Sequence, residues 1–249
     1  MPARSTALSD RLAGLVELHG PGGSLDKARG RAALTRAIYE NFEALRPILI
    51  AGGSGKPIGS PSGAVRAWCE EAVDHHVLRR KGQGYRAAGN GARTYLAGAW
   101  LEELMALALL ACGCRNVRFA QQVRWRAPGQ EEEHFNEVDA IALHDERLVI
   151  VSCKATATDL LERSHGEERL FHAMLELSYW NAHFAAREAL PVFVTTTDFF
   201  DEEAGVFRSP KLMERARVLG LTVLTADFSL SERLFARLRR ALGDAAPPD

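Results

Sequence analysis

The chain has 249 residues, 47% of them hydrophobic and 25% charged, with a formal net charge of −1 at pH 7. This composition predicts a soluble globular protein with one large domain or two small ones. Because no apolar run approaches the roughly 20 residues that cross a bilayer, and because the first residues lack a secretory signal, we expect a cytoplasmic location and no membrane partner. The four cysteines have no zinc-type spacing and are expected to be buried or free thiols.

The N-terminal region, residues 1–90, is predicted to be mainly helical. Apolar spacing, together with the glycine and proline positions, predicts helices at 6–18, 31–46 and 62–81 and a loop at 51–61.

The third of these helices ends in a basic run, Arg79, Arg80 and Lys81. We interpret this run as a candidate nucleic-acid contact, or only as charge favoured by the helix dipole. Residues 1–92 contain 13 Lys and Arg against 8 Asp and Glu, whereas residues 93–249 contain 18 against 24. This asymmetry is compatible with a phosphate-gripping N-terminal part, and equally with ordinary solvated surface.

A long helix is predicted over residues 94–112, which lack proline and are rich in Leu, Ala, Glu and Met, with Thr94 as its N-cap. Helical spacing places Glu102 and Glu103 on neighbouring apolar stripes. We expect Glu102, in preference to Glu103, to face the sheet, because small residues surround it and permit close approach. The alternative is that one of the two glutamates simply pairs with an arginine at the surface.

A strand hairpin carries the chemistry of the chain. Residues 135–143 and 148–153 have strand composition, and the polar run between them predicts a turn centred on Asp145 and Glu146. In that register the residue numbers of each opposed pair add up to 291. Asp139 therefore faces Ser152, and Glu137 faces Lys154, on one side of the sheet. The opposite side is expected to hold the apolar or thiol side chains Val138, Val151 and Cys153.

Carboxylates in this arrangement can hold a hard divalent cation such as Mg²⁺ or Mn²⁺, with Lys154 beside it. The lysine could then orient an attacking water and offset charge on a phosphodiester. The alternative is a cross-strand ion pair between Glu137 and Lys154 on a solvated face.

Alternating elements follow the hairpin, and together they predict an α/β fold with a mixed central sheet flanked by helices. The expected elements are a polar loop at 155–166, a helix at 167–187, a strand at 191–197, a helix at 211–219, a strand at 222–225, a helix at 229–242 and a disordered tail at 243–249.

Three segments in this order resemble the PD-(D/E)xK nuclease superfamily: residues 95–103, residues 136–139 and residues 152–154. More narrowly, they look like the nuclease domain of the CRISPR-associated endonucleases that cyclic oligoadenylate activates. The resemblance covers roughly residues 85–240 and implies a restriction-endonuclease-like nuclease domain at 91–242.

The resemblance implies a metal-dependent endonuclease that cleaves DNA or RNA, in CRISPR-linked antiviral defence. Asp139 would be the central ligand of Mg²⁺ or Mn²⁺, helped by Glu102, Glu137 and the backbone carbonyl of Cys153. Lys154 would position the attacking water.

Two departures from the family pattern leave alternatives open. Ser152 stands where the superfamily usually has Asp or Glu, so Glu137 would have to replace the missing carboxylate, and the chain is alternatively a degenerate module that binds nucleic acid or a partner protein. Residues 1–90 lack the strand-rich pattern of a cyclic-oligoadenylate sensor. We therefore consider a sensor on another chain, and a homodimer, as partners.

Overall fold

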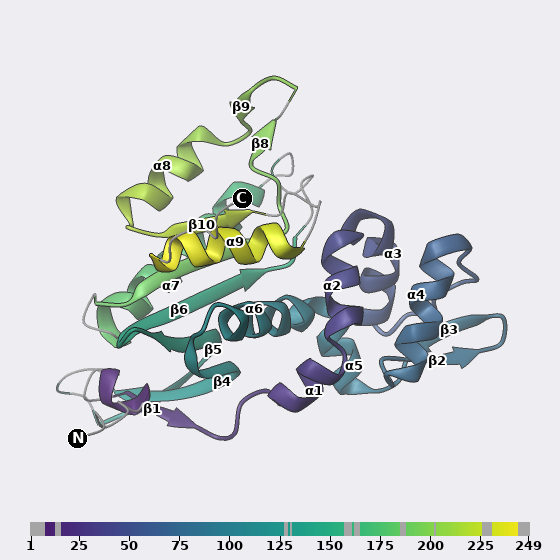
Figure 1. Ribbon diagram of the computed structural model, residues 1–249, viewed down its shortest axis with the longest axis horizontal. Helices are drawn as coiled ribbons and strands as arrows, with labels where there is room; N and C mark the ends of the chain where they lie inside the picture. The colour runs from purple at the N-terminus through teal and green to yellow at the C-terminus, as the bar shows by residue number, and fades with distance from the viewer. Residues whose placement is uncertain are drawn as a thin grey trace.

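The computed structural model describes residues 8–12, 16–126, 129, 131–156, 161, 165–184, 188–201, 203–225 and 231–243. Its centre is a six-stranded mixed sheet in the order β1-β4-β5-β6-β7-β10 (Figure 1). The first three pairings in this order are antiparallel and the last two are parallel. The strands are β1 (Val16–His19), β4 (Arg115–Arg126), β5 (Glu133–His144), β6 (Arg147–Lys154), β7 (Leu190–Thr195) and β10 (Thr222–Thr225).

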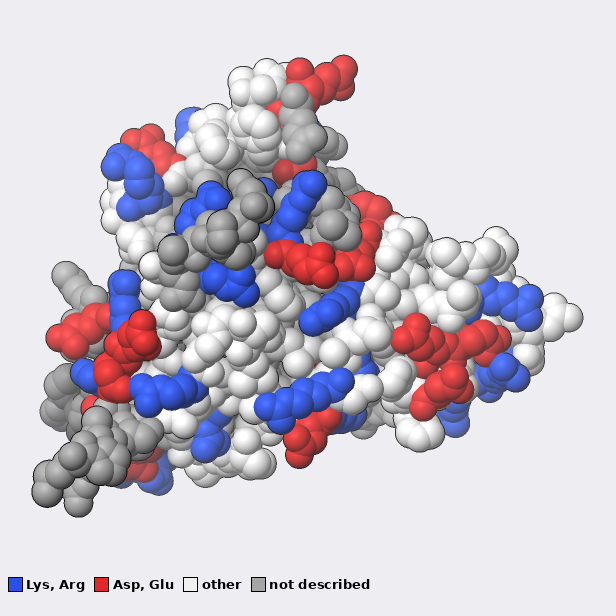
Figure 2. Space-filling model, viewed as in Figure 1, with Lys and Arg blue, Asp and Glu red and all other residues white. Residues whose placement is uncertain are grey.

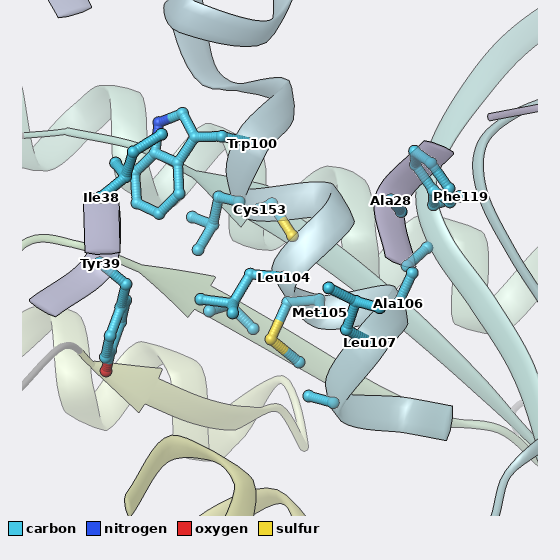
Figure 3. Close-up of a cluster of buried hydrophobic side chains, with 14 of the residues drawn as sticks. Ala28, Ile38, Tyr39, Trp100, Leu104, Met105, Ala106, Leu107, Phe119 and Cys153 are labelled. Carbon is cyan, nitrogen blue, oxygen red and sulfur yellow. The ribbon is translucent and has the colours of Figure 1, made fainter. Parts of the chain in front are cut away.

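Helices cover both faces of this sheet, which confirms the predicted α/β fold. Helices α6 (Trp100–Ala111) and α9 (Ser231–Leu242) lie on one face, and α7 (Gly166–Phe184) and α8 (Pro210–Val218) lie on the other. Side chains alternate along β6 accordingly, so Val149 and Val151 enter one apolar cluster while Leu148 and Ile150 enter the other. Figure 3 shows the first cluster, where residues of α6 meet Ile38 and Tyr39 from the N-terminal region.

The N-terminal region differs from prediction in three places. The segment predicted as a helix at 6–18 contains a 3₁₀ helix, Leu8–Arg11, and the first three residues of strand β1, along which half-buried and exposed residues alternate. The helix predicted at 31–46 is divided at Asn41, and its second part continues to Gly53, into the loop predicted at 51–61. The helix predicted at 62–81 ends at Asp74. The helices of this region are α1 (Leu25–Gly30), α2 (Ala32–Glu40), α3 (Phe42–Gly53) and α4 (Gly63–Asp74).

Residues 78–87 form a separate hairpin of β2 (Leu78–Lys81) and β3 (Gly84–Ala87), which corrects the expected basic helix end. His76, with a φ of 57°, follows the end of α4, and Gly82, with a φ of 59°, supplies the positive φ of the hairpin turn. Arg79, Arg80 and Lys81 are therefore strand residues, and the favourable interaction with a helix dipole does not apply to them.

The helix predicted at 94–112 starts earlier and is kinked. It begins with α5 (Asn90–Thr94), so Thr94 lies inside it instead of capping it, and passes through a π-helical turn at Tyr95–Ala99 into α6. Gly98 has a non-helical backbone with a φ of 158°. The run Asn90–Ala111 is long and apolar enough to cross a membrane, contrary to the sequence expectation, but more than half of it is buried inside the fold as a core helix.

The C-terminal elements lie close to their predicted positions, and β10 has the predicted bounds. Strand β4 and the small hairpin of β8 (Phe200–Asp201) and β9 (Val206–Phe207) were not predicted. The predicted tail beyond residue 243, the first two residues of the helix predicted at 229–242 and much of the loop predicted at 155–166 lie outside the described residues.

Candidate active site

The β5–β6 hairpin has the predicted register, but the regular pairing ends at Ala140 and Val151, so the predicted pairs Asp139–Ser152 and Glu137–Lys154 lie beyond it. Ala140 pairs with Val151 and Ile141 with Ile150, so opposed residues sum to 291. Asp145 and Glu146 form the turn with positive φ values of 43° and 67°. Positive φ at both central residues is the geometry of a tight two-residue hairpin turn that matches the strand twist.

Asp139 lies where the backbone pairing of β5 with β6 ends, and its carboxylate contacts the backbone of the neighbouring strand. The Cys153 N–H donates to Oδ2 of Asp139 at 2.6 Å, and the Ser152 hydroxyl donates to the same oxygen at 3.3 Å. The Lys154 ammonium is 3.7 Å from that oxygen. Within the described residues, all contacts of this carboxylate fall on Oδ2, which leaves Oδ1 available.

The predicted division of faces is wrong at Val138. Val138 belongs to the second apolar cluster, whereas Ala140, Val151 and Cys153 belong to the first. Residues two apart share a face in a regular strand, so β5 changes its orientation at Asp139. On the neighbouring strand β4, Ala120 lies opposite Asp139, and its φ of 43° marks a backbone irregularity. The regular pairing of β4 with β5 skips Ala120 and Asp139.

Glu102 of α6 joins this group, as the small residues around it predicted. Its Oε2 is buried and has no hydrogen-bond partner among the described residues. Burial, reinforced by the nearby charges of Asp139 and Glu137, raises the pKa of Glu102 to about 8, although Lys154 opposes this shift. The structure therefore brings together Glu102, Glu137, Asp139 and Lys154, with Ser152 buried beneath.

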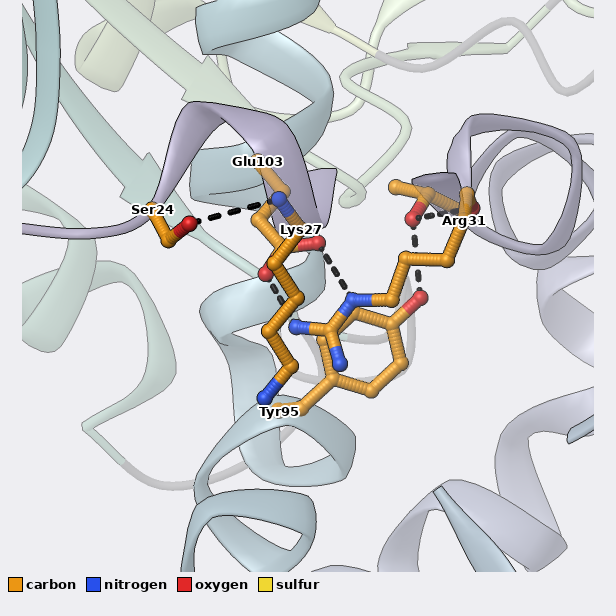
Figure 4. A network of polar contacts seen from close by, with 6 residues as sticks. Ser24, Lys27, Arg31, Tyr95 and Glu103 are labelled. Carbon is orange, nitrogen blue, oxygen red and sulfur yellow. Dashed lines mark hydrogen bonds and ion pairs between the residues drawn. The ribbon is translucent and has the colours of Figure 1, made fainter. Parts of the chain in front are cut away.

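Glu103 faces away from this group and is paired with an arginine in the interior, whereas the sequence left open which glutamate would form such a pair and placed the pair at the surface. Arg31 donates two hydrogen bonds to it, one of them from Nε at 2.8 Å (Figure 4). The Arg31 guanidinium lies 3.9 Å from the centre of the Tyr95 ring, and the Tyr95 hydroxyl is 2.8 Å from that of Thr35. This buried network holds α2 against the kinked helix that presents Glu102.

A threonine cluster, which sequence reasoning missed, fixes the strand end beyond Lys154. The hydroxyl of Thr196 donates to the Thr156 carbonyl at 2.6 Å, and the hydroxyls of Thr156 and Thr197 are 2.7 Å apart. The Thr196 N–H donates to the Lys154 carbonyl at 3.2 Å. Three consecutive threonines after a buried strand were the available sequence signal, because a buried hydroxyl needs a partner.

The predicted nucleic-acid contacts Arg79, Arg80 and Lys81 are exposed and separate from the carboxylates. Figure 1 places their hairpin at the end of the molecule away from the central sheet. Arg80 forms an ion pair with Glu70 at 2.7 Å.

The donor set fits a hard divalent cation that keeps several water ligands. Among the described residues, no group of three or more His, Cys, Asp or Glu side chains lies where it could hold a metal ion, so at most two carboxylates of this arrangement would bind one ion. Mg²⁺ is commonly held by one or two carboxylates, waters and substrate phosphate. The unpartnered oxygen of Glu102 and the free Oδ1 of Asp139 provide such carboxylates. Successive residues of a strand direct their backbone N–H and carbonyl groups to opposite sides. The Lys154 carbonyl points toward β7, so the Cys153 carbonyl points toward β5, as the Cys153 N–H does.

Comparisons with known proteins identify the fold. No protein-family model matches the chain, and no curated protein matches it. The crystal structure of protein VC1899 from Vibrio cholerae is similar with a TM-score of 0.66 and 16% identity, over 92% of this chain and 60% of that one. Can2 from Sulfobacillus thermosulfidooxidans, in complex with cyclic tetra-adenylate, is similar with a TM-score of 0.61 and 11% identity, over 91% and 58%. This chain thus spans about three fifths of each of these chains.

Proposed function

We propose that this chain is a metal-dependent nuclease that hydrolyses phosphodiester bonds of DNA or RNA in a CRISPR-linked system. The observation that carries the proposal is the uncompensated carboxyl of Glu102 beside Asp139 and Lys154 at the end of the β5–β6 pairing. An ionised carboxylate buried among like charges is unfavourable unless it takes up a proton, as the raised pKa of Glu102 indicates, or a cation binds there. The fold-level likeness to Can2 supports the same class.

Each residue has a distinct role in this proposal. A bound Mg²⁺ or Mn²⁺ would supply Lewis-acid stabilisation of the scissile phosphate and an acidified water. Asp139, Glu102 and the Cys153 carbonyl would hold it, with Glu137 close by. The Lys154 ammonium orients the attacking water and offsets negative charge on the phosphate, while the Ser152 hydroxyl and the Cys153 N–H fix the carboxylate of Asp139.

Cleavage assays test this proposal with supercoiled plasmid, single-stranded DNA and single-stranded RNA, each with Mn²⁺ or with EDTA. We expect cleavage only with Mn²⁺, and a loss of at least roughly 100-fold in Asp139→Ala and Lys154→Ala. The matched controls are Asp26→Ala and Lys211→Ala, which remove the same two kinds of charge, one negative and one positive, from exposed helix positions. Both control variants should cleave normally. Equal cleavage by Asp139→Ala and the native chain would contradict the assignment.

One observation favours a second candidate, a module that binds nucleic acid or a partner protein without cleaving. Ser152 provides no charge and its hydroxyl is directed to Asp139, so one carboxylate of the superfamily pattern is absent. Metal-independent binding with no cleavage, both with and without cyclic tetra-adenylate, would favour this candidate. Cytoplasmic location, a homodimer and a sensor on another chain stay predictions, which cell fractionation, light scattering and co-purification can test.

A further inference from the structure

The β2–β3 hairpin has one apolar face and one basic face. Leu78, Tyr85 and Ala87 are buried on the first face, where the hairpin packs near α4. The pairing places Arg79 directly opposite Arg86 on the other face. Lys81 lies two residues from Arg79 and shares that face, because alternate strand residues point to the same side. We call Arg79, Lys81 and Arg86 the basic hairpin face.

The charges of the basic hairpin face are uncompensated within the described part of the chain. No hydrogen bond or ion pair joins Arg79, Lys81 or Arg86 to a carboxylate there. Like charges directly opposite on antiparallel strands destabilise the pair, so the Arg79–Arg86 arrangement is unfavourable without an anion.

Arg80 is paired with a carboxylate, although it lies in the sequence between Arg79 and Lys81, which the described residues leave unpaired. It points to the other face and donates to Glu70 from Nε at 3.1 Å and from Nη2 at 2.7 Å. The Tyr85 hydroxyl donates to the other oxygen of Glu70 at 2.7 Å. The cation of Arg80 is therefore satisfied, and the sequence-based grouping of these three basic residues divides into two environments.

The hairpin is held in a fixed position, so the basic face is pre-organised. Ile58 and Tyr85 exchange two backbone hydrogen bonds of 2.9 Å each, which adds the preceding loop beside β3. The Ser60 hydroxyl donates to the carbonyl of Gln83 at the hairpin turn. A backbone that is fixed before binding leaves only side-chain entropy to be lost when the cations meet a ligand.

We propose that the basic hairpin face binds the phosphate backbone of a polynucleotide. This inference rests on the proposed function, because it assigns a contact for the same substrate away from the scissile bond. The face has three cations, and its fourth position is Gly84, so it offers no apolar anchor for a protein partner or a lipid surface. Figure 2 shows basic side chains at the end of the molecule where Figure 1 draws this hairpin, with acidic side chains beside them.

Fluorescence anisotropy of the full chain with labelled single-stranded and duplex oligonucleotides of about 30 nucleotides tests the inference, in EDTA so that binding is separated from cleavage. Arg79→Ala, Lys81→Ala and Arg86→Ala should each weaken binding roughly 3- to 10-fold near 100 mM salt and reduce the slope of log K against log salt by about 1. Arg80→Ala is the matched control, because it removes the same charge from the same strand but from the other face, and it should change binding less than about 2-fold.

Three outcomes would overturn the inference. One is wild-type affinity and salt slope in the triple variant of the basic hairpin face. Another is an equal loss of binding in Arg80→Ala. The third is a triple variant that loses binding to anionic lipid vesicles while its oligonucleotide binding is unchanged. Normal oligonucleotide binding by the triple variant, with metal-dependent cleavage lost in Asp139→Ala and Lys154→Ala but kept in the triple variant, would reject this inference and leave the nuclease proposal intact. Weakened oligonucleotide binding by the triple variant, together with no cleavage by the native chain, would support this inference and reject the nuclease proposal.

Discussion

At the residue scale, Glu102 links the candidate site to the stability of the chain. Its pKa is about 8 in the folded protein, against the ordinary value of 4.5, because it is buried beside other carboxylates. The folded state therefore binds this proton more tightly than the unfolded state does. Between these two pKa values the unfolded chain ionises first, so the contribution of Glu102 makes the free energy of unfolding fall as pH rises.

Glu102→Gln keeps the shape of the side chain and removes its titration. In EDTA we expect the stability of the variant relative to the native chain to rise between pH 4, where both side chains are largely uncharged, and pH 8.5, by on the order of 5 kcal/mol. Thermal unfolding followed by circular dichroism from pH 4 to 9 measures this. Parallel stability curves for the two proteins would show that Glu102 does not titrate in this window.

The residues of the candidate site differ in how far sequence could place them. Asp139 and Lys154 follow from strand alternation and the turn position, and Glu102 from helical spacing, because these are local rules. The partner of Glu103 could not be deduced, since Arg31 is separated from it by 72 positions. Only the packing of α2 on the kinked helix brings the two side chains together.

At the element scale, the Arg31–Glu103 pair decides how the kinked helix is held. Glu103→Ala leaves the buried Arg31 cation without its carboxylate, and we expect a loss of about 3–5 kcal/mol in the free energy of unfolding. Tyr95→Phe removes only the hydroxyl contact with Thr35 and should cost about 1 kcal/mol. Urea denaturation measures both values. A cost for Glu103→Ala no larger than that of Tyr95→Phe would show that the pair adds little.

The wrong predictions at this scale share a physical cause. The segment predicted at 6–18 overlaps a four-residue edge strand, Val16–His19, that exists because it pairs with β4, a segment about 100 positions away. Residues 78–81 are a strand because Leu78 is buried and Gly82 permits the return of β3. Strand pairing overrode helical spacing in both segments, with a distant partner for β1 and a partner two residues further along for β2. The β5–β6 hairpin was predictable because both of its segments have strand composition and a polar turn separates them.

At the scale of the whole molecule, the first apolar cluster crosses the domain boundary predicted at residue 90. Phe42 of α3 lies against Trp100 of α6, with ring centres 5.8 Å apart. Leu34 and Ile38 belong to the same cluster as Leu104 and Met105 of α6. Strand β1 also completes the sheet edge beside β4. The two regions therefore share a core, and the position of the boundary stays a prediction.

A fragment of residues 91–243 tests whether the nuclease region folds alone. Removing residues 1–90 would expose Trp100, Leu101, Leu104 and Met105, each at most 1% exposed in the full chain. At about 1.5–3 kcal/mol for each large buried side chain, this loss is comparable with a typical total stability of about 5–15 kcal/mol. We expect the fragment to lack a cooperative thermal transition and to bind a hydrophobic dye, and added residues 1–90 to restore the transition. A fragment that melts cooperatively within a few degrees of the full chain would instead make residue 90 a true domain boundary.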